Sequence, residues 1–247
     1  MSRHPNKYEE MFPEEFFAEL ERTPIAYFSS GPLEWHGPHN ALGCDPLKGY
    51  YVCLRAAEIA GGIVMPPLFL GPAGTPSLSR AGLRQSKWRP QPGIFHSREV
   101  MEIVVEETFE RIEQIGFRVC MCFGGHWPNE KMIQDLVDRL GAQVGRLKLW
   151  AGAELALVTD ESLGYAMDHG SKWESSVLMA ARTELVDISR FGTTLDGRIP
   201  DPSWGIATDT DPREASLELG RAYVGHISSN LARKAQELLQ QARQEAK

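Results

Sequence analysis

The residues most able to do chemistry lie in one short segment, residues 31–45, which carries two carboxylates and two imidazoles among glycines and prolines. Glu34 and His36 are two positions apart, so in an extended backbone their side chains point the same way. Asp45 follows after a turn-rich loop. Carboxylate and imidazole groups that converge in this way are typical ligands of a divalent metal ion in a hydrolase. The segment therefore predicts a metal site.

Each candidate ligand also has a simpler explanation when it is taken alone. Asp45 precedes Pro46, so its carboxylate could do no more than cap a helix. Glu34 could be a surface carboxylate, although the glycine and proline around it favour a loop that orients the side chain. His126 follows two glycines and could mark only the start of a helix. The metal-site prediction depends on all of these residues meeting in the fold.

Apolar and amphipathic segments alternate along the chain, as expected for consecutive βα units. Strands are predicted over residues 24–30, 63–70, 117–123, 146–153 and 186–201. Helices are predicted over residues 13–22, 45–59, 96–115, 128–140, 172–182 and 211–241, the last with a break near Gly220 or Gly225. A long loop rich in glycine, proline and serine is predicted over residues 71–92. This order predicts an α/β fold, with a mostly parallel sheet between two helical layers.

Several candidate ligands come directly after predicted strands, because Glu34 and His36 follow the first strand and His126 follows the third. Binding sites of parallel sheets gather beyond the carboxyl ends of the strands. The predicted topology therefore brings these side chains to one edge of the sheet.

Length and composition favour one globular domain spanning residues 1–247. The 26 basic and 33 acidic residues give a net charge of −7, without a basic block. Neither a nucleic acid nor an anionic membrane is therefore an expected partner. The four cysteines lack zinc-ribbon spacing, and we expect reduced, mostly buried thiols. No signal peptide and no membrane-spanning apolar run is found, so a cytoplasmic enzyme is expected.

Four motifs resemble those of the creatininase family of metal-dependent amidohydrolases, in the family's order. Residues 34–45 resemble its Glu-x-His-Gly-Pro-His element with the following Gly-x-Asp. Gly124-Gly125-His126 resembles its Asn-Gly-His element, and residues 169–176 resemble its His-Ala-Gly-x-x-Glu-Thr-Ser element. Residues 205–220 resemble its C-terminal Gly-Asp-Pro-x-x-Ala-Ser-x-x-x-Gly element. The resemblance covers about residues 30 to 220 and implies a three-layer α/β/α sandwich.

The resemblance implies two divalent metal ions per chain, which would be Zn²⁺, Mn²⁺ or Fe²⁺. The implied ligands are Glu34, His36 and His126, with Asp45 bridging the two ions. Such a pair lowers the pKa of a shared water, so that hydroxide is available near neutral pH to attack a carbonyl. The family's chemistry is therefore expected at this segment.

One position departs from the creatinine-hydrolysing members of the family, which carry a glutamate where this chain has Pro128. The second ion then needs another ligand, and Glu174 in the third motif is the candidate. Its simpler explanation is an exposed helix residue. His169 matches the family's catalytic histidine, which is expected to protonate the leaving group. His169 and Glu174 are therefore the candidate catalytic residues.

The implied substrate is a small, polar, cyclic molecule, hydrolysed at the C–N bond of a cyclic amide or a formamide. Tyr165, Trp127, Trp173 and His39 are expected to contact it, although aromatic residues are as often ordinary core. One alternative is a ring-opening C–C hydrolase of a cyclic sugar-derived ketone of the inosose type. Another is a non-catalytic, ligand-binding member of the fold. The resemblance also implies a homo-oligomer, a hexamer in the family.

Overall fold

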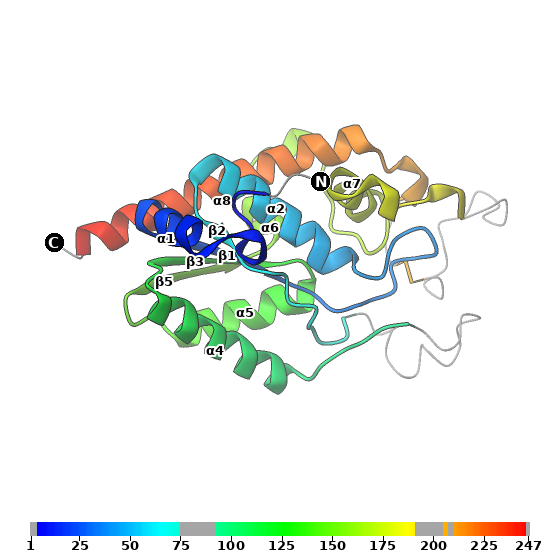
Figure 1. The fold of residues 1–247 in the computed structure, drawn as a ribbon. Helices are drawn as coiled ribbons and strands as arrows, with labels where there is room; N and C mark the ends of the chain where they lie inside the picture. The colour runs from blue at the N-terminus through cyan, green and yellow to red at the C-terminus, as the bar shows by residue number, and fades with distance from the viewer. Residues whose placement is uncertain (1–3, 75–91, 191–204, 207–209, 246–247) are drawn as a thin grey trace.

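A five-stranded sheet lies at the centre of the molecule, with the strand order β2-β1-β3-β5-β4. The computed structural model describes residues 4–74, 92–190, 205–206 and 210–245. β1 pairs in parallel with β2 and β3, β3 pairs in parallel with β5, and β4 is antiparallel to β5. The strands are β1 (Ile25–Ser30), β2 (Ile63–Val64), β3 (Val119–Gly124), β4 (Gln143–Val144) and β5 (Leu147–Gly152). The predicted, mostly parallel sheet is confirmed (Figure 1).

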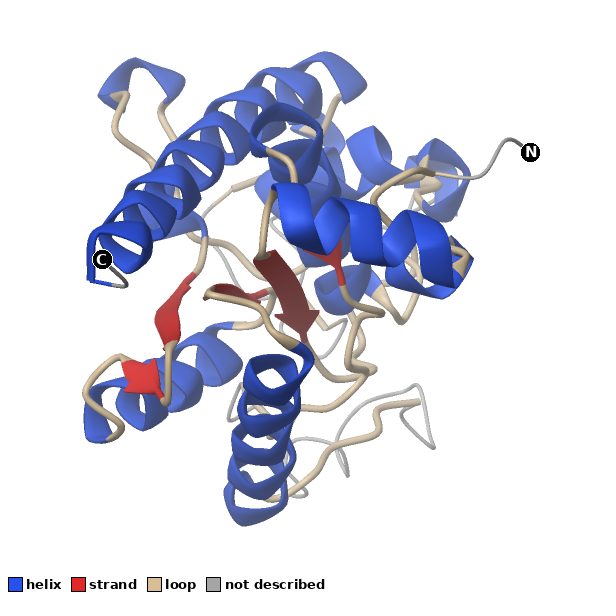
Figure 2. Ribbon diagram, turned by 60° about the vertical axis from the view of Figure 1, so that its left-hand side comes forward, coloured by secondary structure: helices blue, strands red, loops and turns tan. Residues whose placement is uncertain are grey.

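Helices cover both faces of this sheet, so the predicted three layers are confirmed. The helices are α1 (Pro13–Arg22), α2 (Cys44–Ala60), α4 (Arg98–Ile115), α5 (Trp127–Arg139), α6 (Glu154–Leu157), α7 (Lys172–Ala181) and α8 (Leu217–Glu245). α2, α7 and α8 lie on one side of the strands, and α4 and α5 lie on the other (Figure 1). Figure 2 shows the strands between helices. Within the described ranges, no helix has the length and apolar character needed to cross a membrane.

Alternating side chains of the central strands divide the core into two halves. Tyr27 and Met121 pack with α2 and α8, whereas Phe28 and Cys122 pack with α4 and α5. β1 and β3 are buried along their whole length, as expected for strands covered on both faces. All four cysteines are unpaired and buried, which confirms the expectation of reduced thiols.

The chain departs from the predicted elements at several places. The second strand ends at Val64, because the prolines at positions 66 and 67 have no backbone N–H for the ladder. The short β4 was not predicted. α8 is continuous through Gly220, where a Cβ would lie 1.9 Å from the carbonyl oxygen of Ser176. The glycine therefore allows α8 to pack closely on α7, and it does not break the helix.

Two predicted segments lie partly outside the described residues. Residues 75–91 of the long loop and residues 191–201 of the fifth predicted strand are among those that the structure does not describe. In the described part of that strand prediction, Val186 forms only an isolated bridge with Asn40. Residues 188–190 form a 3-10 turn, so the strand prediction is wrong there.

Candidate metal centre

The carboxyl ends of three parallel strands bring polar side chains to one edge of the sheet. Glu34 follows β1, His126 follows β3, and Glu154 follows β5. This placement confirms the expectation for the first two residues. Glu154 was not predicted, although the same rule about strand ends would have found it.

Asp45 reaches this edge from the first turn of α2, and not as the helix cap that its sequence context suggested. The N-cap residue of α2 is Gly43, without a capping side-chain hydrogen bond. The start of α2 lies so close to β3 that a Cβ at Gly125 would be 2.1 Å from the carbonyl oxygen of Asp45. Glycine at this position therefore permits the approach that carries the Asp45 carboxylate into the site.

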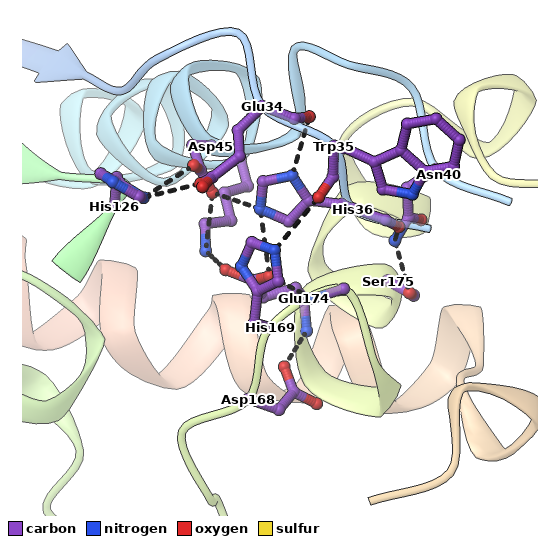
Figure 3. Close-up of polar contacts among 12 residues, drawn as sticks. Glu34, Trp35, His36, Asn40, Asp45, His126, Asp168, His169, Glu174 and Ser175 are labelled. Atoms are coloured by element: carbon purple, nitrogen blue, oxygen red, sulfur yellow. Dashed lines mark hydrogen bonds and ion pairs between the residues drawn. The ribbon is translucent and has the colours of Figure 1, made fainter. Parts of the chain in front are cut away.

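Glu34, Asp45 and His126 form a first ligand group, which we call site A (Figure 3). Nδ1 of His126 lies 3.1 Å from Oε2 of Glu34 and 3.1 Å from Oδ2 of Asp45. Glu34 and Asp45 are fully buried, and His126 is 6% exposed. Three separate elements therefore place one ligand each at site A.

His36, Asp45 and Glu174 form a second ligand group beside the first, which we call site B. Nε2 of His36 lies 3.0 Å from Oδ1 of Asp45 and 3.3 Å from Oε2 of Glu174. Cys44 belongs to the same group, but burial and the nearby Glu174 raise the pKa of its thiol well above the usual value. Asp45 thus directs one carboxylate oxygen toward each site.

The ligand atoms of both sites fit divalent cations. In the described structure, both oxygens of Glu34, both oxygens of Asp45 and Nε2 of His36 lack a hydrogen-bond partner of suitable geometry. Atoms that lie about 2.0–2.2 Å from a shared ion are about 3–3.5 Å from one another. The nitrogen–oxygen pairs of both sites have this spacing. Because buried charge is costly without a partner, such atoms are suited to holding cations.

Backbone carbonyls orient the two imidazoles for ligation. Nδ1 of His36 lies 3.1 Å from the carbonyl oxygen of Glu34, and Nε2 of His126 lies 3.0 Å from that of Pro72. When each of these nitrogens donates its hydrogen to the carbonyl, the other ring nitrogen presents a lone pair to the site. Metal-binding histidines commonly have this outer partner.

The surrounding carboxylates shift the pKa values of the imidazoles in the metal-free protein. Burial alone would lower the pKa of His36, but Asp45 and Glu174 raise it to about 10. Burial likewise opposes protonation of His126, but Asp45 and Glu34 raise its pKa to about 9. Both rings therefore hold a proton at pH 7 until a cation replaces it.

His169 lies beside site B, as the sequence predicted, and its ring centroid is 4.3 Å from that of His36. Its Nε2 lies 3.1 Å from the carbonyl oxygen of Trp35. Burial, with a further contribution from His36, lowers the pKa of His169. Asp168 does not orient this ring, because its carboxylate accepts the backbone N–H groups of the first turn of α7.

Lys48 is a buried cation at this centre that the sequence analysis missed. The residue is 3% exposed, and its Nζ donates a hydrogen bond to Oε1 of Glu174. Nζ also lies 3.6 Å from Oδ1 of Asp45 and 3.6 Å from Oε1 of Glu154. Burial would lower the pKa of Lys48, but these carboxylates raise it well above the usual value. Its position three residues after Asp45, on the same helix face, was the available signal.

A cavity of about 310 Å³ opens beside both sites. Its wall contains His126, His169 and Glu174 together with Trp127 and Tyr165, two of the aromatic residues expected to contact a substrate. Trp127 is 57% exposed. A molecule in the cavity would therefore touch the ligand groups and two aromatic rings.

The other two residues expected to contact a substrate lie away from this cavity, so their contact with a substrate stays a prediction. Trp173 is buried in the core and packs against Tyr165 and Tyr223, with ring centroids 5.3 and 5.6 Å away. His39 is buried, and its Nε2 lies 2.9 Å from Oγ of Ser175. Among the described residues neither belongs to the cavity wall, because each faces a packed helix.

Three carboxylates in the cavity wall have raised pKa values, and Asp168, whose pKa burial and Glu174 raise to about 6, is one of them. Burial raises the pKa of Glu154 to about 7, against the opposing effect of Lys48. Burial also raises the pKa of Glu130, whose Oε1 accepts the backbone N–H of Ala153 at 3.0 Å. The sequence analysis did not single out Glu130, which lies inside a helix without a motif.

Comparison with known proteins gives matches over nearly the whole chain. A family model described as Creatininase, creatinine amidohydrolase, matches residues 9–246. A creatinine amidohydrolase from Pseudomonas putida is 28% identical over 176 residues, which is 65% of this chain. The match spans 65% of that relative's own length, slightly less than two thirds.

Solved creatininases share the fold. A structure described as Creatininase Mn has a TM-score of 0.71 at 21% identity, and the match covers 94% of this chain and 98% of that one. A mutant creatininase of the Zn-Zn type has a TM-score of 0.72 at 21% identity, and the match covers 96% and 98% of the two chains. Together with the family model, these matches show that the chain belongs to the creatininase family of metal-dependent amidohydrolases.

Proposed function

We propose that this chain is a metal-dependent hydrolase that cleaves a C–N bond, in a cyclic amide or a formamide, of a small polar substrate. The observation that carries the proposal is the orientation of Asp45, whose Oδ1 faces His36 and whose Oδ2 faces His126. A carboxylate placed between two ligand groups suits a pair of divalent ions. The Mn and Zn-Zn types among the solved relatives support Mn²⁺ or Zn²⁺.

Cations held at sites A and B would lower the pKa of a bound water and polarise a carbonyl. Glu34 and His126 would hold one cation, His36 and Glu174 the other, and Asp45 would contact both. The buried ligands keep bulk water away from these positions, which strengthens every charge interaction there.

His169 is the proposed proton carrier. Its lowered pKa keeps the ring neutral at pH 7, so it has one nitrogen free to accept a proton. The carbonyl of Trp35 fixes the ring at the cavity wall, within reach of a bound substrate. We expect His169 to take a proton during attack on the carbonyl and to deliver it to the leaving nitrogen.

The cavity supports a small substrate rich in N–H groups. Its volume of about 310 Å³ suits a compact molecule, and Trp127 and Tyr165 offer aromatic surfaces. Glu130, Glu154 and Asp168 add carboxyl groups that can accept hydrogen bonds from such a substrate. The comparisons favour neither the ring-opening C–C hydrolase nor the non-catalytic protein.

A substrate panel with metal counting tests this proposal. Purified protein loaded with Mn²⁺ or Zn²⁺ would be assayed with creatinine, formamides, hydantoins and inosose-type ketones. We expect turnover of a C–N substrate and a loss on the order of a thousandfold in Glu34→Gln, which lacks one ligand charge. Glu184→Gln, at an exposed carboxylate away from the site, is the matched control.

The possible outcomes separate the alternatives. Full activity in Glu34→Gln would contradict the proposed mechanism. Turnover of the ketone alone would indicate the C–C hydrolase, and a protein that binds no metal and turns over none of these substrates would be a non-catalytic member. The single-domain organisation, a cytoplasmic location and a homo-oligomeric, hexameric assembly stay predictions.

A further inference from the structure

Lys48 contacts two ligands of site B, Glu174 and Asp45, and of the site A residues it contacts only the shared Asp45. Its Nζ donates to Oε1 of Glu174, whose other oxygen, Oε2, faces His36 and accepts the backbone N–H of Gly170 at 2.7 Å. The Asp45 oxygen near Lys48 is Oδ1, which faces His36. The ammonium group therefore lies next to both carboxylates that a cation at site B requires.

Site A has no such neighbour in the part of the chain that the structure describes. The ion pairs of Glu34 and His126 there are with each other and with Asp45. Both oxygens of Glu34 lack a hydrogen-bond partner of suitable geometry, whereas both oxygens of Glu174 accept hydrogen bonds. Among the described residues, Glu174 of site B thus has a lysine beside it, whereas the charged partner of Glu34 in site A is the His126 imidazole, whose proton a cation would displace.

Coulomb's law then makes the two sites unequal. The Lys48 ammonium repels a divalent ion that enters site B. It also neutralises part of the negative charge of Glu174 and Asp45, which weakens their attraction for that ion. Because Lys48 is almost fully buried, water screens this repulsion poorly. Glu154, 3.6 Å from Nζ, offsets part of the positive charge.

We propose that Lys48 makes the metal centre asymmetric, so that site A binds a divalent ion tightly and site B binds one at least about tenfold more weakly. The inference rests on the proposed function, because it needs the two sites to be metal sites. Lys48 acts here as a positioning residue, which holds Glu174 in place while site B has no ion.

Titration of the chelator-treated full chain with Mn²⁺ tests this inference without an activity assay. Calorimetry gives both affinities, and the electron paramagnetic resonance signal of free Mn²⁺ counts the unbound ions. We expect two steps in the wild type, separated by about tenfold or more. In Lys48→Met, which keeps most of the unbranched side chain and removes the charge, site B should tighten by about tenfold and site A by less than about threefold.

Two further variants assign and control these steps. Glu34→Gln should remove the tight step, because Glu34 is a ligand of site A and is not in the group of His36, Asp45 and Glu174 that forms site B. Lys172→Met removes another lysine near α7, one that pairs with the exposed Glu214, and should change neither step. Loss of the weak step in Glu34→Gln, with the tight step intact, would overturn the assignment.

Glu154→Gln gives a second test if Lys48→Met does not fold. This variant removes the carboxylate that lies beside Lys48 and changes no proposed metal ligand. The affinity of site B for Mn²⁺ should therefore fall by about threefold or more. The inference would be overturned by equal Mn²⁺ affinities of the two sites in the wild type. It would also be overturned if site B bound Mn²⁺ more weakly in Lys48→Met, or if its affinity were unchanged or higher in Glu154→Gln. If neither site binds Mn²⁺ or Zn²⁺, the proposed metal centre itself fails.

Discussion

Helices α2 and α4 have nearly the same length, 17 and 18 residues, but they lie in opposite environments. α2 buries eleven of its residues, including Asp45 and Lys48, so charged groups stand inside the protein. α4 buries only four residues, spaced as a single apolar stripe, and keeps its charges at the surface. The amphipathic α4 is therefore typical of a helix that serves as scaffold.

The charged residues of the two helices also differ in solvation, because those of α4 lie in water and those of α2 are buried. Arg98 on α4 pairs with Glu102 and Asp135 in water, where such pairs contribute roughly 0–1 kcal/mol. Asp45 and Lys48 lose their hydration, and a buried pair is often no more stable than apolar residues of the same volume. The buried charges of α2 thus fit the proposed metal centre, whereas those of α4 need no ligand.

The strongest test of this contrast is Asp45→Asn, which removes the shared charge and keeps the shape of the side chain. We expect metal binding to weaken at both sites and turnover to fall on the order of a thousandfold, about 4 kcal/mol. Metal counting and steady-state kinetics measure the two effects. Asp135→Asn, at the exposed partner of Arg98, is the control, and equal losses in both variants would break the comparison.

On the scaffold side, Phe109→Ala should destabilise the fold without changing the metal centre. Phe109 is fully buried in the core between α4 and the sheet, so its truncation should cost about 3–5 kcal/mol in the free energy of unfolding. Chemical denaturation measures that cost. A large fall in Mn²⁺ affinity of the folded variant would show that α4 does more than support the sheet.

Metal affinity should increase with pH, because protons compete for the imidazoles. With a pKa of about 9 for His126 and about 10 for His36, both rings are protonated in the metal-free protein at pH 7. Each ion must displace a proton, so apparent affinity per site should rise about tenfold per pH unit between pH 7 and 9. Titrations in buffers of different ionisation enthalpy would count the released protons, and a flat profile would contradict this.

The same pKa shifts predict the stability of the metal-free protein. A histidine with a raised pKa stabilises the fold fully below its unfolded value of about 6.5. That contribution is lost as the pH rises through the folded values of about 9 and 10. Thermal unfolding of the metal-free chain should therefore shift to lower temperature from pH 7 to 10. The Asp45→Asn variant should show a smaller shift, since Asp45 raises both values.

The smallest expected effect is at the start of α4, where the hydroxyl of Ser97 accepts the backbone N–H of Val100 at 3.4 Å. Ser97→Ala removes this cap and should cost about 1 kcal/mol or less in the free energy of unfolding. Metal binding should stay the same. Denaturant unfolding measures the change in stability. A change in Mn²⁺ affinity would show that α4 also influences the metal centre.

Local patterns were enough to predict the alternation of strands and helices and the meeting of Glu34, His36 and His126. Each of these side chains follows a strand, and parallel strands end at one edge of the sheet. The same patterns failed where a contact distant in the chain decides the outcome. Lys48 meets Glu174 across 126 positions, and Trp173 lies in the core because Tyr223 of α8 packs on it. No local pattern predicts either contact, although the i,i+3 spacing from Asp45 indicated the helix face on which Lys48 lies.

The amino-acid sequence by itself determined the ligand types, the order of the elements and the edge at which the site lies, because strand and helix periods are local properties. Only the tertiary structure decided which carboxylate oxygen of Asp45 faces which imidazole. It also decided that Lys48 is buried against site B. Burial and orientation depend on the packing of α2 against β3 and α7, and those contacts exist only once the chain is folded.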